Sequence, residues 1–158
     1  MTDEAFTYHR AIAPMMWVFV GLASIEVLVV HGLLALWLPW LALMLSIVTV
    51  AGIGWLVLAI RSMKHRPVLL GDERVLMRVG TIRAISVPLA NIADVRGEIA
   101  RAEIDRRTLD LALIAHPNTV LMLRSPQRVG AREVHAVAHR LDDPAAFTAA
   151  LERRRASV

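Results

Sequence analysis

The chain has 158 residues, of which 56% are hydrophobic, and it carries a formal net charge of +4 at pH 7. It contains no cysteine, which excludes disulfides, cysteine-ligated metals and thiol catalysis and agrees with a cytoplasmic soluble part. The charges are unevenly spread, because residues 11–60 contain no lysine, arginine or aspartate, whereas 17 of the 18 basic residues follow residue 60. We therefore expect an apolar N-terminal part and a charged C-terminal domain.

The apolar stretch predicts two antiparallel membrane helices. Residues 11–60 are too long for one helical crossing of a hydrocarbon core of about 30 Å, but they are long enough for two. Pro39 in "LWLPWL" disfavours helical geometry at the preceding residue and suits the first turn of a new helix. We expect an N-terminal segment over 1–11 and a two-helix hairpin over 12–61. A signal peptide would have one short apolar run, and a buried soluble pair would carry polar stripes, which the second run lacks.

The residues beside the membrane predict the orientation of the hairpin. Arg61, Lys64 and Arg66 follow the second helix, basic residues precede the first, and the connecting turn carries no charge. Basic residues are retained on the cytoplasmic side, so both termini are expected in the cytoplasm and the protein in the inner membrane. Trp37 and Trp40 lie at the turn, where their amphipathic rings suit the opposite headgroup level. These five residues are the predicted membrane-interface anchors.

Glu26 and His31 are the only ionisable residues in the apolar stretch. An ionised carboxylate in the bilayer core costs several kcal/mol unless it is paired or protonated, so such a residue indicates a contact or a function. Counting back from the turn brings both residues to the depth of Ser46 and Thr49 on the second helix. We interpret all four as intramembrane polar contacts, within one chain or between copies.

Other roles for Glu26 and His31 remain open at this point. They are five residues apart, which is about 140° around a helix, so they do not share a helix face. A metal site within a single chain is therefore not expected. A haem held by His31 from two copies is geometrically conceivable. A proton-linked or ligand-binding role in a larger complex is a further alternative.

Short strands separated by tight turns are predicted for the domain over 62–158. The segments "RPVLLGDERVLMRVG", "TIRAISVPL" and "NIADVRGEI" contain apolar runs of strand length, interrupted by glycine, proline or acidic residues. The polar stretch "EIARAEIDRR" has no clear pattern. A hairpin is expected from "LDLALIA" and "TVLMLRS", which the turn "HPN" joins.

A strand and a helix are predicted at the end of the chain. After a loop around Pro126 and Gly130, "EVHAVAHRL" alternates and predicts a strand with His135 and His139 on its outward face. In "DDPAAFTAALERRR" an aspartate can cap a helix with Pro144 at its first position, and the arginines complement the dipole at its end. The domain is thus expected to have six to seven antiparallel strands capped by a C-terminal helix.

This order of elements resembles the bacterial pleckstrin-homology-domain (PH-domain) membrane proteins. The resemblance lies in "RPVLL" after the membrane, in "VLMRVGTIRAISVPLANIADV" with its Arg-x-Gly and Pro-Leu-x-x-Ile, and in "LDDPAAFTAALERR". It implies a transmembrane helical pair followed by an α+β PH-like domain, in which a helix closes two roughly orthogonal sheets. It also implies a domain that makes contacts and is not a catalyst, and it brings no agreed active-site residues.

The sequence favours binding over catalysis. It has no phosphate-binding glycine loop, HExxH or GxSxG motif, so we expect no enzyme activity, catalytic residues, metal or cofactor. The basic domain should be attracted to the anionic inner leaflet, and without a recognition helix or aromatic platform nucleic acid is not an expected partner. We expect a membrane-anchored interaction or assembly module that contacts the lipid bilayer and a protein partner or a homo-oligomer. The alternative is a small subunit of a transport or electron-transfer complex that uses Glu26 and His31.

Overall fold

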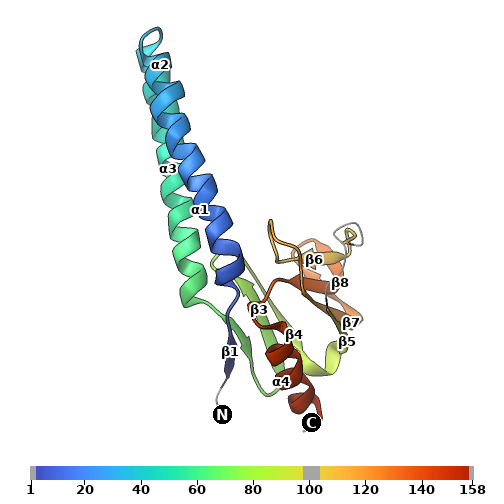
Figure 1. The fold of residues 1–158 in the computed structure, drawn as a ribbon. Helices are drawn as coiled ribbons and strands as arrows, with labels where there is room; N and C mark the ends of the chain where they lie inside the picture. The colour runs from blue at the N-terminus through green and yellow to red at the C-terminus, as the bar shows by residue number, and fades with distance from the viewer. Residues whose placement is uncertain (1–2, 98–103, 157–158) are drawn as a thin grey trace.

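A computed structural model describes residues 3–97 and 104–156 (Figure 1). A long helical hairpin rises from a domain that contains two β-sheets and a C-terminal helix. The first rod of the hairpin comprises α1 (His9–Glu26), a π-helical turn (Val27–His31) and α2 (Gly32–Ala35), and the second rod is α3 (Pro39–His65). The segments Ile12–Ala35 and Pro39–His65 are long and apolar enough to cross a membrane.

Pro39 begins the second rod, in agreement with its predicted role. It occupies the first turn of α3, where a missing backbone N–H costs no helical hydrogen bond. The preceding residue, Leu38, is not helical, and its N–H donates to the carbonyl oxygen of Leu34 at 2.8 Å. The two rods are therefore joined by a very short turn.

The first sheet contains β1 (Glu4–Phe6), β2 (Val68–Leu70), β3 (Arg74–Val79) and β4 (Arg83–Pro88), in that order. All of its neighbouring strands are antiparallel. Strand β1 precedes the hairpin and β2 follows it, yet the two pair directly, with Glu4 opposite Leu70 and Phe6 opposite Val68. The hairpin is thus a long insertion between two adjacent strands, and the N-terminal segment is part of the sheet.

The second sheet contains β5 (Ile92–Arg96), β6 (Thr108–Asp110), β7 (Thr119–Val129) and β8 (Arg132–His139), in the order β5-β7-β8-β6. The described part of residues 62–158 thus contains seven strands, β2 to β8, which equals the upper limit of the prediction, and β1 from the N-terminal segment adds an eighth. The last two residues of the segment predicted as "NIADVRGEI", 98–99, lie outside the described residues.

The predicted hairpin between "LDLALIA" and "TVLMLRS" is wrong. Strand β6 pairs with β8, and it does so in parallel, with Thr108 opposite Ala136 and Asp110 opposite Ala138. The chain leaves the strand at Leu111, whose N–H still donates to the Ala138 carbonyl at 2.8 Å and whose side chain is fully buried. The local turn signal at "HPN" suggested that these two segments pair with each other. Burial of Leu111 and the pairing of β6 with β8 give the chain a different path.

Pro126 does not lie in a loop, contrary to the prediction, because β7 continues through it to Val129. The pairing of β7 with β8 shifts register between Met122 and Gln127. Proline cannot donate to a strand ladder, and such an irregularity is where a sheet tolerates it. The turn between β7 and β8 is at Gly130, which has a positive φ of 61°.

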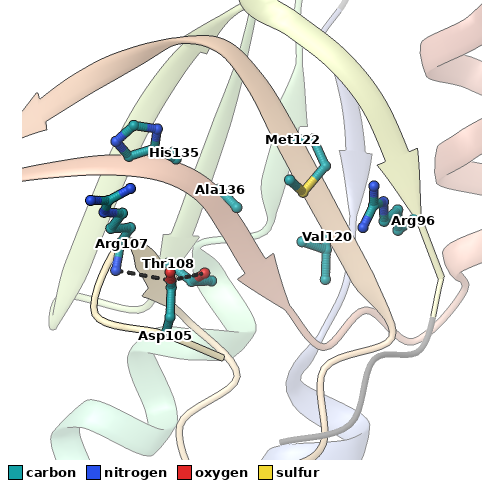
Figure 2. A pocket seen from close by; sticks show the side chains of 8 residues that line it. All are labelled: Arg96, Asp105, Arg107, Thr108, Val120, Met122, His135 and Ala136. Atoms are coloured by element: carbon teal, nitrogen blue, oxygen red, sulfur yellow. Dashed lines mark hydrogen bonds between the residues drawn. The ribbon is translucent and has the colours of Figure 1, made fainter. Parts of the chain in front are cut away.

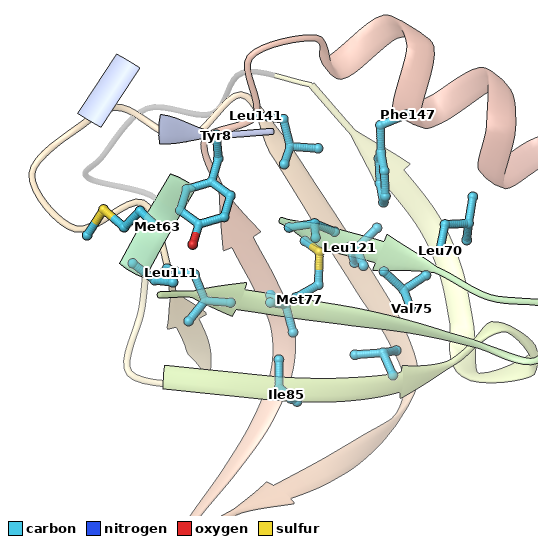
Figure 3. Packing of buried hydrophobic residues seen from close by; sticks show 14 of the residues in the cluster. Tyr8, Met63, Leu70, Val75, Met77, Ile85, Leu111, Leu121, Leu141 and Phe147 are labelled. Carbon is cyan, nitrogen blue, oxygen red and sulfur yellow. The ribbon is translucent and has the colours of Figure 1, made fainter. Parts of the chain in front are cut away.

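One apolar core joins both sheets, the C-terminal helix α4 (Pro144–Ala156) and the base of the hairpin (Figure 3). Tyr8 and Met63 come from the hairpin base, whereas Met77, Leu121 and Phe147 come from the two sheets and α4. The predicted cap of α4 is confirmed, since the Asp143 carboxylate accepts the Ala146 N–H at 2.9 Å. Because the hairpin base shares the core, the hairpin and the domain form one packed unit.

Candidate functional site

Two of the predicted intramembrane residues meet between the helices. His31 ends the π-helical turn and is only 5% exposed, and its Nδ1 lies 3.1 Å from the Ser46 hydroxyl oxygen on α3. A polar contact of this kind between membrane helices contributes about 0.6 to 2 kcal/mol. It fixes the depth at which the two rods pack against each other.

Glu26 and Thr49 do not meet within one chain. Glu26, the last residue of α1, is exposed, and its carboxyl group has no hydrogen-bond or ion-pair partner among the described residues. The Thr49 hydroxyl donates to the Leu45 carbonyl of its own helix at 3.0 Å, and this bond satisfies its donor. The π-helical turn follows Glu26 directly and ends at the inward-facing His31. Such turns are rare and frequently lie at functional sites.

The predicted anchors lie at the two ends of the hairpin. Trp37 and Trp40 are 84% and 67% exposed at its turn. Arg61, Lys64 and Arg66 are exposed at the opposite end, beside the domain. Aromatic side chains thus lie at one end of the apolar segment and basic side chains at the other, and both types suit the headgroup level of a membrane.

Tyr8 locks the base of the hairpin to the domain. Its side chain is fully buried, and its hydroxyl donates to the Arg66 carbonyl at 3.0 Å and accepts the Gly80 N–H at 2.6 Å. Burial raises the pKa of Tyr8, so the phenol stays neutral. Gly80 turns the chain between β3 and β4 with a φ of +51°, and a Cβ there would lie 2.4 Å from the Ser62 Oγ of α3. The β3–β4 turn therefore packs closely against α3.

His139 also belongs to this junction, contrary to the prediction of an outward face. It is fully buried, with Nε2 at 3.0 Å from the Arg78 carbonyl and Nδ1 at 3.1 Å from the Arg140 carbonyl, and its ring centroid lies 4.9 Å from that of Tyr8. Burial lowers the pKa of His139, while the two carbonyl oxygens oppose that effect. The predicted alternation fails only from Ala136 onward, because Val134 lies in the main core as expected, whereas Ala136 and Ala138 pack in a separate cluster and Val137 belongs to the main core.

Sequence reasoning missed Tyr8 and Gly80. Neither belongs to a periodic pattern, and the available signal was only that Tyr8 comes directly before the apolar stretch and Gly80 in a predicted turn. Within residues 3–97 and 104–156, no group of three histidine, aspartate or glutamate side chains is arranged to hold a metal ion. The junction holds the hairpin base and the sheets together, since the Tyr8 and His139 side chains hydrogen-bond to backbone atoms of other elements.

Comparison with protein-family models, curated proteins and solved structures finds no match for this chain. The architecture consists of two long apolar N-terminal helices, two four-stranded sheets and a C-terminal helix. This α+β arrangement is consistent with a PH-like domain.

Proposed function

We propose that this chain is an inner-membrane protein whose cytoplasmic PH-like domain acts as a membrane-anchored interaction or assembly module. The observation that carries the proposal is the direct pairing of β1 with β2 on either side of the hairpin. The apolar hairpin is thereby built into the sheet of the domain. A flexible tether would let the domain turn freely, whereas this connection gives it one orientation.

The basic residues at the hairpin base support contact with the inner leaflet. Arg61, Lys64 and Arg66 are exposed directly beside the apolar segment. Each basic residue that reaches an anionic membrane surface contributes about 1 kcal/mol of attraction. Together with the Tyr8 lock, this attraction would hold one face of the domain towards the lipid and leave the opposite face for a protein partner.

Glu26 supports assembly inside the membrane. Its carboxyl group is exposed on the side of the hairpin, within the segment that is apolar enough to span. A carboxyl group facing acyl chains is unfavourable, and such residues normally face a protein neighbour. A membrane helix of a protein partner, or of a second copy, that covers Glu26 would remove this cost.

Placement can be tested with single cysteines, because the chain has none of its own. Leu38→Cys marks the hairpin turn and Ala131→Cys marks the β7–β8 turn, and both positions are exposed. With a membrane-impermeant maleimide, we expect Leu38→Cys to be labelled in cells with an opened outer membrane. Ala131→Cys should be labelled only after lysis. The reverse pattern, or release of the protein by alkaline carbonate, would overturn the proposed placement.

A second candidate function, a small subunit of a transport or electron-transfer complex, is favoured by the exposed Glu26. Glu26→Gln keeps hydrogen bonding but cannot ionise, and Glu26→Leu removes both properties. Native electrophoresis of complexes from the membranes of the source cell separates the candidates. An assembly role predicts that only Glu26→Leu loses the partner. A complex that stays assembled but loses activity with Glu26→Gln would favour the second candidate.

A further inference from the structure

The outer face of the second sheet carries a basic cavity that no part of the proposed function uses. Its volume is about 270 Å³. Arg96 at the end of β5, Arg107 just before β6 and His135 on β8 contribute its polar side chains (Figure 2). Its floor is formed by three apolar side chains of β7 and β8, namely Val120, Met122 and Ala136.

Most of the positively charged side chains around the cavity have no partner among the described residues. Among the described residues, the Arg107 guanidinium and the His135 ring make no hydrogen bond or ion pair. Arg96 has only a surface contact of 3.6 Å with Asp94, whose side chain is 63% exposed. Surface pairs of this kind contribute little and leave the guanidinium available to another anion.

Among the described residues that line the cavity, Asp105 is the one carboxylate, and it already has partners. It accepts the Thr108 hydroxyl and the Arg107 backbone N–H, both at 2.9 Å. These bonds, together with the nearby Arg107 charge, lower the pKa of Asp105 and keep it ionised. Asp105 therefore shapes the turn that carries Arg107, and the described lining, with two arginines and one aspartate, has a net positive charge.

Arg107 and His135 are held next to each other by the sheet. The His135 backbone N–H donates to the Arg107 carbonyl at 2.7 Å. Figure 2 shows their side chains together at one end of the cavity, with Arg96 at the other end and the apolar floor between them. A ligand that spans both ends would meet cationic groups at its ends and apolar surface along its middle.

The cavity lies at the end of the sheet from which the hairpin rises. Arg96 is opposite Val120, and the next residue of β7, Thr119, is opposite His139, which packs on Tyr8 at the hairpin base. The cavity is therefore one row of the sheet away from the junction. Figure 1 agrees, since β6 and the turn before it lie on the hairpin side of the domain.

We infer that this cavity binds the headgroup of an anionic phospholipid of the adjacent leaflet. Arg96, Arg107 and His135 pair with the phosphate and hydroxyl oxygens, in the way that guanidinium groups match phosphate geometry. The apolar floor accounts for a lipid in preference to free phosphate, because a small hydrated ion would leave Val120 and Met122 uncovered. The inference rests on the proposed placement of the domain beside the membrane.

The test uses the full-length chain in detergent and native mass spectrometry. The probes are dioctanoyl-phosphatidylglycerol, dioctanoyl-phosphatidylcholine and inorganic phosphate. Phosphatidylglycerol should bind more tightly than phosphatidylcholine, whose choline cation opposes the arginines. Arg96→Gln combined with Arg107→Gln should weaken phosphatidylglycerol binding about tenfold or more, the loss that corresponds to one charge-assisted contact. Arg107→Gln alone should give a smaller loss, and both arginines are exposed, so folding should persist.

The matched control is Arg74→Gln combined with Arg83→Gln, which removes the same charge from exposed positions of the first sheet. This control should bind phosphatidylglycerol like the original protein. An equal loss in the control, no preference between the two lipids, or inorganic phosphate binding as tightly as phosphatidylglycerol would each overturn the inference. Cysteine labelling and carbonate extraction report the placement separately, so a correctly inserted protein that fails here overturns this inference alone.

Discussion

The hairpin and the domain use the same apolar residue types in opposite ways. Leu28 and Val48 of the hairpin are 76% and 70% exposed, whereas Leu121 and Val75 of the sheets are completely buried. Only 11% of the apolar window of each of the two candidate membrane-spanning segments is buried within the chain. Burial away from water accounts for the domain, whereas the hairpin leaves a large apolar surface exposed. The proposed membrane placement supplies an apolar solvent for that surface.

The boundary between the two regions is made of satisfied polar groups. Tyr8 and His139 are fully buried, and each contacts backbone polar atoms of the other elements at the junction. Buried polar groups cost free energy unless they are hydrogen-bonded, so this junction accepts few alternative geometries. The contrast shows that the change from exposed to buried apolar side chains occurs near the junction around Tyr8 and Arg66.

The largest expected effect comes from truncating the same residue type in each region. Leu121→Ala leaves a cavity in the core and should lower the free energy of unfolding by about 2 to 5 kcal/mol. Leu28→Ala removes an exposed side chain and should change it by no more than about 0.5 kcal/mol. Denaturant unfolding of the detergent-solubilised protein measures both. Comparable losses at the two positions would contradict the contrast between the regions.

The next effect sharpens the position of the boundary. Gly80→Ala places a methyl group against Ser62 in a left-handed turn, and we expect a loss of about 2 to 3 kcal/mol from strain and overpacking. Gly130→Ala has the same kind of φ but open space around it, so about 1 kcal/mol is expected. Thermal unfolding compares the two variants. If they lose the same stability, the β3–β4 turn does not press on α3.

Local physics explains which parts of this fold were predictable. The helices could be predicted because length and apolarity over tens of residues are local properties, and because Pro39 marks where the second helix begins. The parallel pairing of β6 with β8 could not, because no local pattern reports which distant strand is a neighbour. Strand β1 has three residues, too few for a periodic signal. His139 was predicted to face outward because strict alternation placed Ala136 and Ala138 on the inner face, and this pattern does not report that the strand changes face after Val134.

The candidate site was predictable to the same extent. The depth count predicted that His31 and Ser46 would be near each other, because a hairpin with a short turn pairs residues equidistant from it. It could not predict the rotation of Glu26, which depends on the π-helical turn that follows it. The basic cavity combines residues of three separated segments, and only the sheet brings them together.

A smaller effect should appear in the pH dependence of stability. Because the pKa of His139 is lowered in the folded protein, the unfolded chain binds more protons near its ordinary value of 6.5. Stability from this residue is present above about pH 6.5 and should fall as the pH drops below it, by at most about 1.4 kcal/mol per pH unit. His139→Gln should flatten a plot of melting temperature against pH, and exposed His116→Gln should not. An unchanged slope in His139→Gln would exclude this role.

The smallest predicted effect tests the polar contact inside the hairpin. Ser46→Ala removes the partner of His31 Nδ1 and should loosen the packing of α2 and the π-helical turn against α3 by about 0.6 to 2 kcal/mol. Thr49→Ala is the matched control, since its hydroxyl bonds only to the Leu45 carbonyl of its own helix. A double-mutant cycle with His31→Ala, measured by unfolding in detergent, isolates the pairwise contribution. A coupling free energy near zero for His31 with Ser46, or an equal one for His31 with Thr49, would show that the hairpin is held by apolar packing alone.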